Sequence, residues 1–569
     1  MEFKKTGRAV ALLGAVLVGG TACQDLQVPN TNNADRARAT SNPQDIQAFI
    51  GGAIFPGIWD GIHEDEDVQA AWPAASELIG TMQGQNTDLQ FDEFAEPRSS
   101  HDNGIVLSQG NGPQGARDFW AQITQTASVP FDGLQVLDSG VEIIVNGVNL
   151  TPQARAFAKF TQGWTWGYMG LIFDEAHVLS ETTTLPSAPD ALLETTLESL
   201  EAYPEVISSA VTSLEEAVAV AQANPGVVNY PSINESALWF GATEPVSNSK
   251  FIGIASTMAA RLIVLSARTP ADRAALDWNK VLQLTANGLN EGHGDYLFQL
   301  NAQRESDLLI EAQSNEPTSE RNLRWDYRAI GPADQSGAYQ DWISASLANR
   351  DRFDILTPDP RITVPLQPQT DGAYTRYRED DNGFIRDRGS YLYAAYQWTR
   401  HMNELGPGFE SDEDLGEDDG SHPLITVDEN NLLRAEALLR TGDAAGAAEL
   451  INVSRTRSHT IDGVEYPGLP PVTAAGVPTD GNDHCVPRQD DGDCGTLLDA
   501  IRYERMVELA VTDAVRGYAE MRGWGTLPDG SLLHWPVPGN VLDLYGLPGY
   551  TYGGVGGEAS ATYGPVSNP

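Results

Sequence analysis

The chain has 569 residues, of which 41% are apolar, and its 35 Lys and Arg face 79 Asp and Glu, a formal net charge of −44. The apolar share is sufficient for a folded core and excludes a wholly disordered chain. The acidity excludes broad binding to nucleic-acid phosphates, which requires clustered Lys and Arg, and it disfavours docking on an anionic membrane surface.

The N-terminus has the pattern of an export signal. Three basic residues lie within positions 4–8, an apolar run covers positions 9–18, and small residues then lead to Cys23. The apolar run is too short to span a membrane. We therefore predict a lipoprotein signal peptide over residues 1–22, lipidation of Cys23 and a polar lipidated tether over residues 23–34. An ordinary signal peptide followed by an incidental cysteine is the alternative.

Helical periodicity dominates the first half of the chain. Residues 152–173 begin next to a Thr-Pro pair and place aromatic side chains three and four positions apart, which predicts an α-helix whose rings pack in the core. Residues 205–222 repeat the apolar pattern. Residues 249–267 and 271–288 form a further predicted pair, interrupted at Pro270.

The clearest predicted helix pair lies in the C-terminal part. Residues 428–440 form one helix, Gly442 suits a left-handed C-cap, and Asp443 suits the N-cap of a second helix in which Ala447 and Ile451 face inward. Repeated helix–turn–helix pairs predict a mostly α fold with tetratricopeptide-like helix pairs, although the strict 34-residue consensus is absent.

Between about residues 296 and 425 the helical periodicity fades, and aromatic residues occur among Asn, Asp, Arg, Gly and Pro. A long irregular stretch in a compact protein is typically functional. Because flat aromatic rings stack on the C–H faces of sugars, we predict ligand contacts by Trp325, Tyr327, Tyr339 and Trp342. In the alternative, these rings pin an irregular loop onto the helical scaffold.

Cys485 and Cys494 lie nine positions apart in an Asp-rich loop, and an isolated pair in an oxidising compartment is most simply a disulfide. A zinc site would need further ligands and is the weaker interpretation. We predict no cofactor and no metal site. Bound Ca²⁺ is an alternative, because this ion takes oxygen ligands and the chain has many carboxylates. No ligands are assigned, because the EF-hand spacing does not occur.

Glu504 and Glu508 are the carboxylate pair that a glycosidase interpretation would use. They lie four residues apart on one predicted helix that packs in the array, so they do not obviously line a cleft. The chain also contains no Gly-x-Ser-x-Gly elbow, no His-Glu-x-x-His and no phosphate-binding loop. We therefore predict a protein that is not an enzyme, with no catalytic residues.

Several segments follow one another in an order that points to a known family. The segments are residues 23–30, Ala154-Arg155-Ala156-Phe157, Ala435-Glu436-Ala437, Arg440-Thr441-Gly442-Asp443, Glu504-Arg505, Glu508-Leu509, Arg516, Trp524-Gly525, Pro536-Val537-Pro538 and Pro548-Gly549-Tyr550. In this order the chain resembles the SusD/RagB family of lipid-anchored, nutrient-binding outer-membrane proteins. The family's usual Glu-Gly before the arginine is replaced around Asp513, which indicates a diverged member.

The resemblance implies a SusD-like fold in a single domain over residues 35–569. The helical scaffold would cover about 40–295 and 426–525, and an irregular ligand-facing region would cover about 296–425. The motif segments are structural in that family, so none of them is carried over as a ligand contact.

The resemblance also implies a function. The protein would be a lipid-anchored, cell-surface lipoprotein of the outer membrane that binds an oligosaccharide or a peptide. It would pass this nutrient to a SusC-like TonB-dependent β-barrel transporter. A secreted glycoside hydrolase and a periplasmic tetratricopeptide-type protein-binding adaptor are the alternatives, because fold by itself does not determine function.

Overall fold

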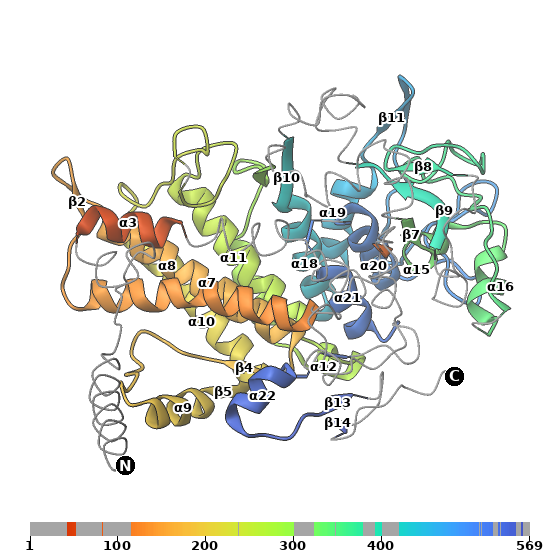
Figure 1. The fold of residues 1–569 in the computed structure, drawn as a ribbon. Coiled ribbons are helices and arrows are strands. Elements are labelled where there is room, and N and C mark those ends of the chain that lie inside the picture. The colour runs from red at the N-terminus through yellow and green to blue at the C-terminus, as the bar shows by residue number, and fades with distance from the viewer. Residues whose placement is uncertain are drawn as a thin grey trace, which may run out of the picture.

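The computed structural model describes residues 42–52, 82–83, 115–236, 238–300, 324–346, 349–378, 393–400, 420–510, 512–513, 515–526, 533–534, 536–552 and 559–560. The predicted signal peptide, Cys23 and the tether lie outside the described residues. Within these ranges the fold is mostly α, as predicted, and its strands are short (Figure 1). None of the described helices is both long and apolar enough to cross a membrane.

Long helices build the N-terminal half of the scaffold (Figure 1). They are α7 (Gly115–Asp138), α8 (Thr151–Ile172), α10 (Tyr203–Ala223) and α11 (Asn248–Leu265), with the short α3 (Pro43–Gly51) against α7 and α8. Glycines on α8 allow close helix approach, because a Cβ at Gly163 would lie 2.7 Å from the Ala210 carbonyl oxygen of α10. A Cβ at Gly167 would lie 2.5 Å from Cδ1 of Leu262 on α11.

The aromatic face predicted for residues 152–173 lies in the core. Phe157, Trp164 and Tyr168 are at most 8% exposed. The Phe157 ring meets the Phe240 ring edge-on at 5.1 Å, a favourable geometry for two aromatic quadrupoles. The interpretation of this face as core packing is confirmed.

The prediction of one continuous helix over residues 271–288 is wrong. The chain forms two helices there, α12 (Pro270–Ala275) and α13 (Trp278–Ala286). The Asp277 side chain accepts a hydrogen bond from the Lys280 backbone N–H at 3.0 Å and caps α13. A capping aspartate in a helical pattern begins a new helix, which the apolar spacing by itself did not reveal.

The C-terminal scaffold consists of α18 (Val427–Arg440), α19 (Ala444–Arg455), α20 (Leu497–Glu508) and α21 (Arg516–Trp524). The predicted turn between the first two is confirmed. Gly442 has φ +98°, and the Asp443 carboxylate accepts the Gly446 backbone N–H at 2.9 Å. Ala447 and Ile451 are buried, as the inward face requires.

The segment predicted as irregular contains antiparallel sheet as well as loops. β6 (Tyr296–Leu300) pairs with β10 (Gly420–Ile425), and a second sheet has the order β1 (Met82–Gln83), β7 (Arg324–Asp326), β9 (Tyr393–Trp398) and β8 (Thr375–Tyr377). After β7 come the short helices α15 (Tyr327–Ile330), η3 (Gly331–Ala333) and α16 (Ala338–Ser344). Strands distant in sequence thus form hydrogen bonds with one another's backbone N–H and C=O groups. Local periodicity in the sequence does not show which strands pair.

The remaining described elements are short. They are β2 (Ile144–Val145), β3 (Val148–Asn149), β4 (Glu175–His177), α9 (Pro189–Glu198), β5 (Leu200–Ala202), β11 (His459–Ile461), β12 (Val464–Tyr466), α22 (Gly539–Tyr545), β13 (Thr551–Tyr552) and β14 (Ala559–Ser560). One apolar core fills the N-terminal helical half, and a second joins the four-stranded sheet to α20 and α21.

Candidate binding site

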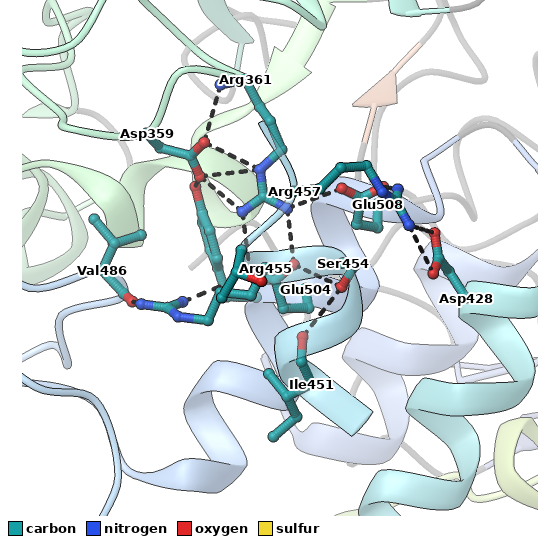
Figure 2. A network of polar contacts seen from close by, with 12 residues as sticks. Asp359, Arg361, Asp428, Ile451, Ser454, Arg455, Arg457, Val486, Glu504 and Glu508 are labelled. Carbon is teal, nitrogen blue, oxygen red and sulfur yellow. Dashed lines mark hydrogen bonds and ion pairs between the residues drawn. The ribbon is translucent and has the colours of Figure 1, made fainter. Parts of the chain in front are cut away.

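The two carboxylates on α20 are locked in a buried ion cluster (Figure 2). The Arg361 guanidinium contacts Glu504 at 2.8 Å and Glu508 at 3.2 Å. Glu508 is also contacted by Arg400 at 3.0 Å and by Arg457 at 3.5 Å. Both glutamates are at most 1% exposed. The cluster therefore ties α20 to segments from three other parts of the chain.

This environment does not suit acid–base chemistry. Burial would raise the pKa of Glu508, but the guanidiniums of Arg400, Arg361 and Arg457 outweigh it and hold the pKa below its ordinary value. A general acid in glycoside hydrolysis needs a raised pKa and access to the sugar. Glu508 has neither, and Glu504 is equally enclosed, so the pair acts in packing.

A second buried cluster joins α12, α18, α20 and α21. Arg273 donates two hydrogen bonds to Glu436, at 2.9 and 2.6 Å, and contacts Glu520 at 2.8 Å. Arg505 donates to Glu436 at 2.7 Å and also contacts Glu520. Burial would raise the pKa of Glu436, yet Arg273 and then Arg505 lower it to about 2. The motif residues Glu436 and Arg505 thus hold helices together.

The four aromatic residues predicted as ligand contacts are all buried. Trp325 and Tyr327 are 0% exposed, and Tyr339 and Trp342 are 4% exposed. The Tyr327 ring stacks on the Phe353 ring at 4.2 Å, and the Tyr339 and Trp342 rings stack at 6.0 Å. Enclosed rings offer no open face to a sugar, so the contact prediction does not fit Trp325, Tyr327 and Trp342, which pin this segment to the scaffold.

Tyr339 differs because it lines a cavity of about 610 Å³. The walls come from α15 and α16, from α20 and α21, and from the loop at residues 487–491. Met506, Met521 and Trp524 supply apolar surface. Cavities of roughly 300–1,000 Å³ with apolar walls and a few polar groups are the usual form of a small-molecule site. This cavity is our candidate binding site.

Tyr339 brings an unused hydrogen-bonding group to the cavity. Nε1 of Trp524 has no partner among the described residues either, but this atom is enclosed in the protein and does not reach the cavity surface. In the described part of the chain the Tyr339 hydroxyl also makes no hydrogen bond. Burial raises the pKa of Tyr339, so its hydroxyl keeps its proton and can donate. An unpaired buried donor is costly, and a ligand oxygen would relieve that cost.

A disulfide holds the loop that forms one wall of the cavity. Cys485 and Cys494, the pair that the sequence suggests, are bonded with their Cα atoms 5.7 Å apart. Within the loop, Arg488 donates to the Gln335 side-chain oxygen at 2.9 Å and to the Gly492 carbonyl at 2.7 Å. Because residues 487–491 line the cavity, these bonds fix the shape of the wall.

Sequence reasoning found Tyr339 and the cysteine pair separately, but not that Tyr339 and the loop between the two cysteines line the same cavity. It missed Asp490, Met506 and Met521 as wall residues, and it placed Trp524 in a motif without a binding role. No local pattern signals such a wall, because its members come from separate elements. Among the described residues, no group of three or more His, Cys, Asp or Glu is arranged to hold a metal ion.

Comparison with known proteins identifies the fold. No family model matches the sequence, and no curated protein does. A SusD superfamily protein from Bacteroides thetaiotaomicron matches with a TM-score of 0.50 at 11% identity, over 89% of this chain and 97% of its own. A SusD superfamily protein from Bacteroides fragilis has a TM-score of 0.49 at 13% identity, over 89% and 98%. A SusD-like carbohydrate binding protein from Bacteroides vulgatus has a TM-score of 0.45 at 13% identity, over 82% and 81%. The predicted SusD-like fold is confirmed.

Proposed function

We propose that this chain, whose fold is that of the SusD superfamily, is a non-enzymatic lipoprotein on the outer-membrane surface. It captures an oligosaccharide and delivers it to a SusC-like TonB-dependent transporter. The observation that carries the proposal is the fold match over 89% of this chain and 97% of the Bacteroides thetaiotaomicron protein. The segment that ends at Cys23 supports export and lipidation.

The cavity beside α20 and α21 is the proposed capture site. Its apolar walls suit the C–H faces of a sugar, and the Tyr339 hydroxyl, which makes no hydrogen bond among the described residues, suits one of its oxygens. Affinity would then come from stacking, hydrogen bonds and shape. The energy for transport would enter through the barrel partner.

The ion cluster around Glu508 removes the carboxylate pair on which the hydrolase alternative rested. Release of reducing sugar from polysaccharides by the purified protein would support the hydrolase alternative. Shielding of the protein from protease added to whole cells would favour the periplasmic adaptor instead.

The test of the proposal is a mild-detergent pull-down of the tagged lipoprotein from its native outer membrane, followed by mass spectrometry. The expected result is a near-stoichiometric TonB-dependent β-barrel. Calorimetric titration of the same material with an oligosaccharide panel should then show saturable binding. A lipoprotein recovered without any barrel, or one that binds no oligosaccharide, contradicts the corresponding half of the proposal.

A further inference from the structure

Among the described residues, three arginines line the cavity, and two of them are held by protein oxygens. Arg328 donates to both carboxylate oxygens of Asp326, at 3.0 and 3.2 Å. Arg488 donates from each of its guanidinium nitrogens to a protein oxygen, at 2.9, 2.7 and 2.7 Å. A ligand would have to break these bonds before it could use either guanidinium.

Arg502, on α20, is the third arginine of the wall and is held more loosely. Its one ion pair among the described residues is with Asp499 at 3.5 Å, which is long for a hydrogen bond. The guanidinium also lies 5.7 Å from the Trp524 ring, a contact that uses none of its N–H groups. Nε of Arg502 is enclosed and has no partner, whereas 32% of the whole side chain is exposed. The terminal amino groups are therefore the donors that Arg502 can offer to a ligand.

Asp490, on the loop between the two bonded cysteines, lines the same cavity. Within the described ranges no hydrogen bond or ion pair reaches its carboxylate, so none joins it to Arg502. Partial burial and then the charges of Asp499 and Asp491 raise the pKa of Asp490, and the Arg502 guanidinium acts against that rise. Two opposite charges thus lie within electrostatic reach of each other on the cavity wall without being in contact.

A group that bridges this gap has to donate to the carboxylate and accept from the guanidinium. A hydroxyl can do both, and two adjacent hydroxyls of a sugar ring can share the two tasks. An anionic group would satisfy Arg502 but would meet the carboxylate of Asp490, and a cationic group would satisfy Asp490 but would meet Arg502. Hydrogen bonds to ionised partners are about twice as strong as neutral ones, so a hydroxyl bridge would contribute substantially to affinity.

We propose that Asp490 and Arg502 form one subsite that holds a pair of adjacent sugar hydroxyls, with the carboxylate accepting and the guanidinium donating. The inference rests on the proposed function, because it assigns ligand contacts within the proposed capture site. The ligand class that fits is a neutral saccharide with a free vicinal diol.

The experiment is calorimetric titration of the full mature lipoprotein in detergent with neutral oligosaccharides of glucose, mannose and xylose. The tightest binder is then titrated into Asp490→Asn, Arg502→Gln and the double variant. Asp493→Asn is the matched control, because Asp493 lies in the same loop, is exposed and is not among the residues that line the cavity. Arg502→Lys keeps the positive charge without the planar fork and takes the place of Arg502→Gln if that variant does not unfold cooperatively.

Each single substitution should weaken binding by about tenfold or more, because it removes a hydrogen bond to an ionised partner. The double variant should lose less than the product of the two single losses, since both residues hold the same hydroxyl pair. Asp493→Asn should keep the wild-type affinity.

Unchanged or tighter binding by either single variant overturns the inference and leaves the capture function standing. Single losses that simply multiply in the double variant also overturn it, because they show that the two residues do not act on one shared group. A wild-type protein that binds none of the saccharides overturns both the inference and the capture function.

Discussion

Acidic side chains take different roles in this protein, according to the guanidinium groups around them. Glu508 lies among Arg361, Arg400 and Arg457 and is held ionised in the core. Asp490 lies on a cavity wall and has no ion pair among the described residues. The first can act only in packing, because its charge is neutralised and enclosed. The second has free acceptor capacity and can meet a ligand.

Replacement of Glu508 by Gln should destabilise the protein by about 3–5 kcal/mol, because it leaves buried guanidiniums without their counter-charge. The measurement is the urea midpoint of the mature chain. Glu449→Gln is the matched control, since Glu449 is exposed on α19, and it should change stability by less than about 0.5 kcal/mol. Equal midpoints for the two variants would mean that the cluster around Glu508 contributes little to the fold.

The buried ion pairs of Glu436 should make the stability of the protein depend on pH. The folded pKa of Glu436 is about 2, against an ordinary value of 4.5. A carboxylate with a depressed folded pKa contributes stability that is present above pH 4.5 and is lost as pH falls toward 2. Thermal midpoints measured from pH 6 down to about 2 should therefore fall. Glu436→Gln should be less stable at pH 6 and should show a shallower decline, whereas Glu449→Gln should keep the wild-type slope.

At the scale of elements, small residues decide how closely the helices pack. α8 lies against both α10 and α11, and its glycines occupy the points of closest approach. Helix propensity would favour alanine at these positions by about 1 kcal/mol. Glycine is found because the neighbouring helix occupies the volume of a side chain.

Gly163→Ala should destabilise the fold by about 1–3 kcal/mol, because the new Cβ would lie 2.7 Å from a backbone carbonyl oxygen that cannot move aside. Gly170→Ala is the control on the same helix. Its Cβ would meet side-chain atoms of Ile207 at 3.0 Å, and these can shift, so the gain in helix propensity should offset most of the cost. Thermal unfolding that ranks the two variants the other way would contradict this account of α8.

At the scale of the whole molecule, charge and anchoring are linked. A chain with a net charge of −44 is repelled by anionic lipid surfaces, and none of its described helices is suited to span a membrane. In the proposed lipoprotein, acyl chains on Cys23 would provide attachment to the outer membrane, since each buried CH₂ group contributes about 0.8 kcal/mol.

Cys23→Ala should therefore move the protein from the membrane pellet to the soluble fraction after cell lysis. The measurement is fractionation by centrifugation, with mass spectrometry of the peptide that contains Cys23. Gln24→Ala, at the neighbouring position, is the control and should remain in the pellet with its acyl chains. A Cys23→Ala protein that stays in the membrane would show that another contact holds it there.

The sequence by itself determined the features that depend on neighbouring residues. These are the helical period at residues 152–173, the turn at Gly442 and Asp443, and the mostly α fold class. Each follows from side-chain spacing, backbone freedom or capping within a few positions of the chain. The order of the motif segments also led to the SusD-like fold, which the structural comparison confirms.

Only the tertiary structure decided which residues could meet a ligand. Trp325 and Tyr339 are both aromatic residues in the same stretch, yet one is enclosed in the core and the other lines a cavity. Glu508 and Asp490 are both acidic, yet one is neutralised and the other is free to accept. Burial and charge pairing depend on contacts between elements distant in the chain. A side chain's exposure and its partners are therefore properties of the packed molecule, which local sequence patterns do not contain.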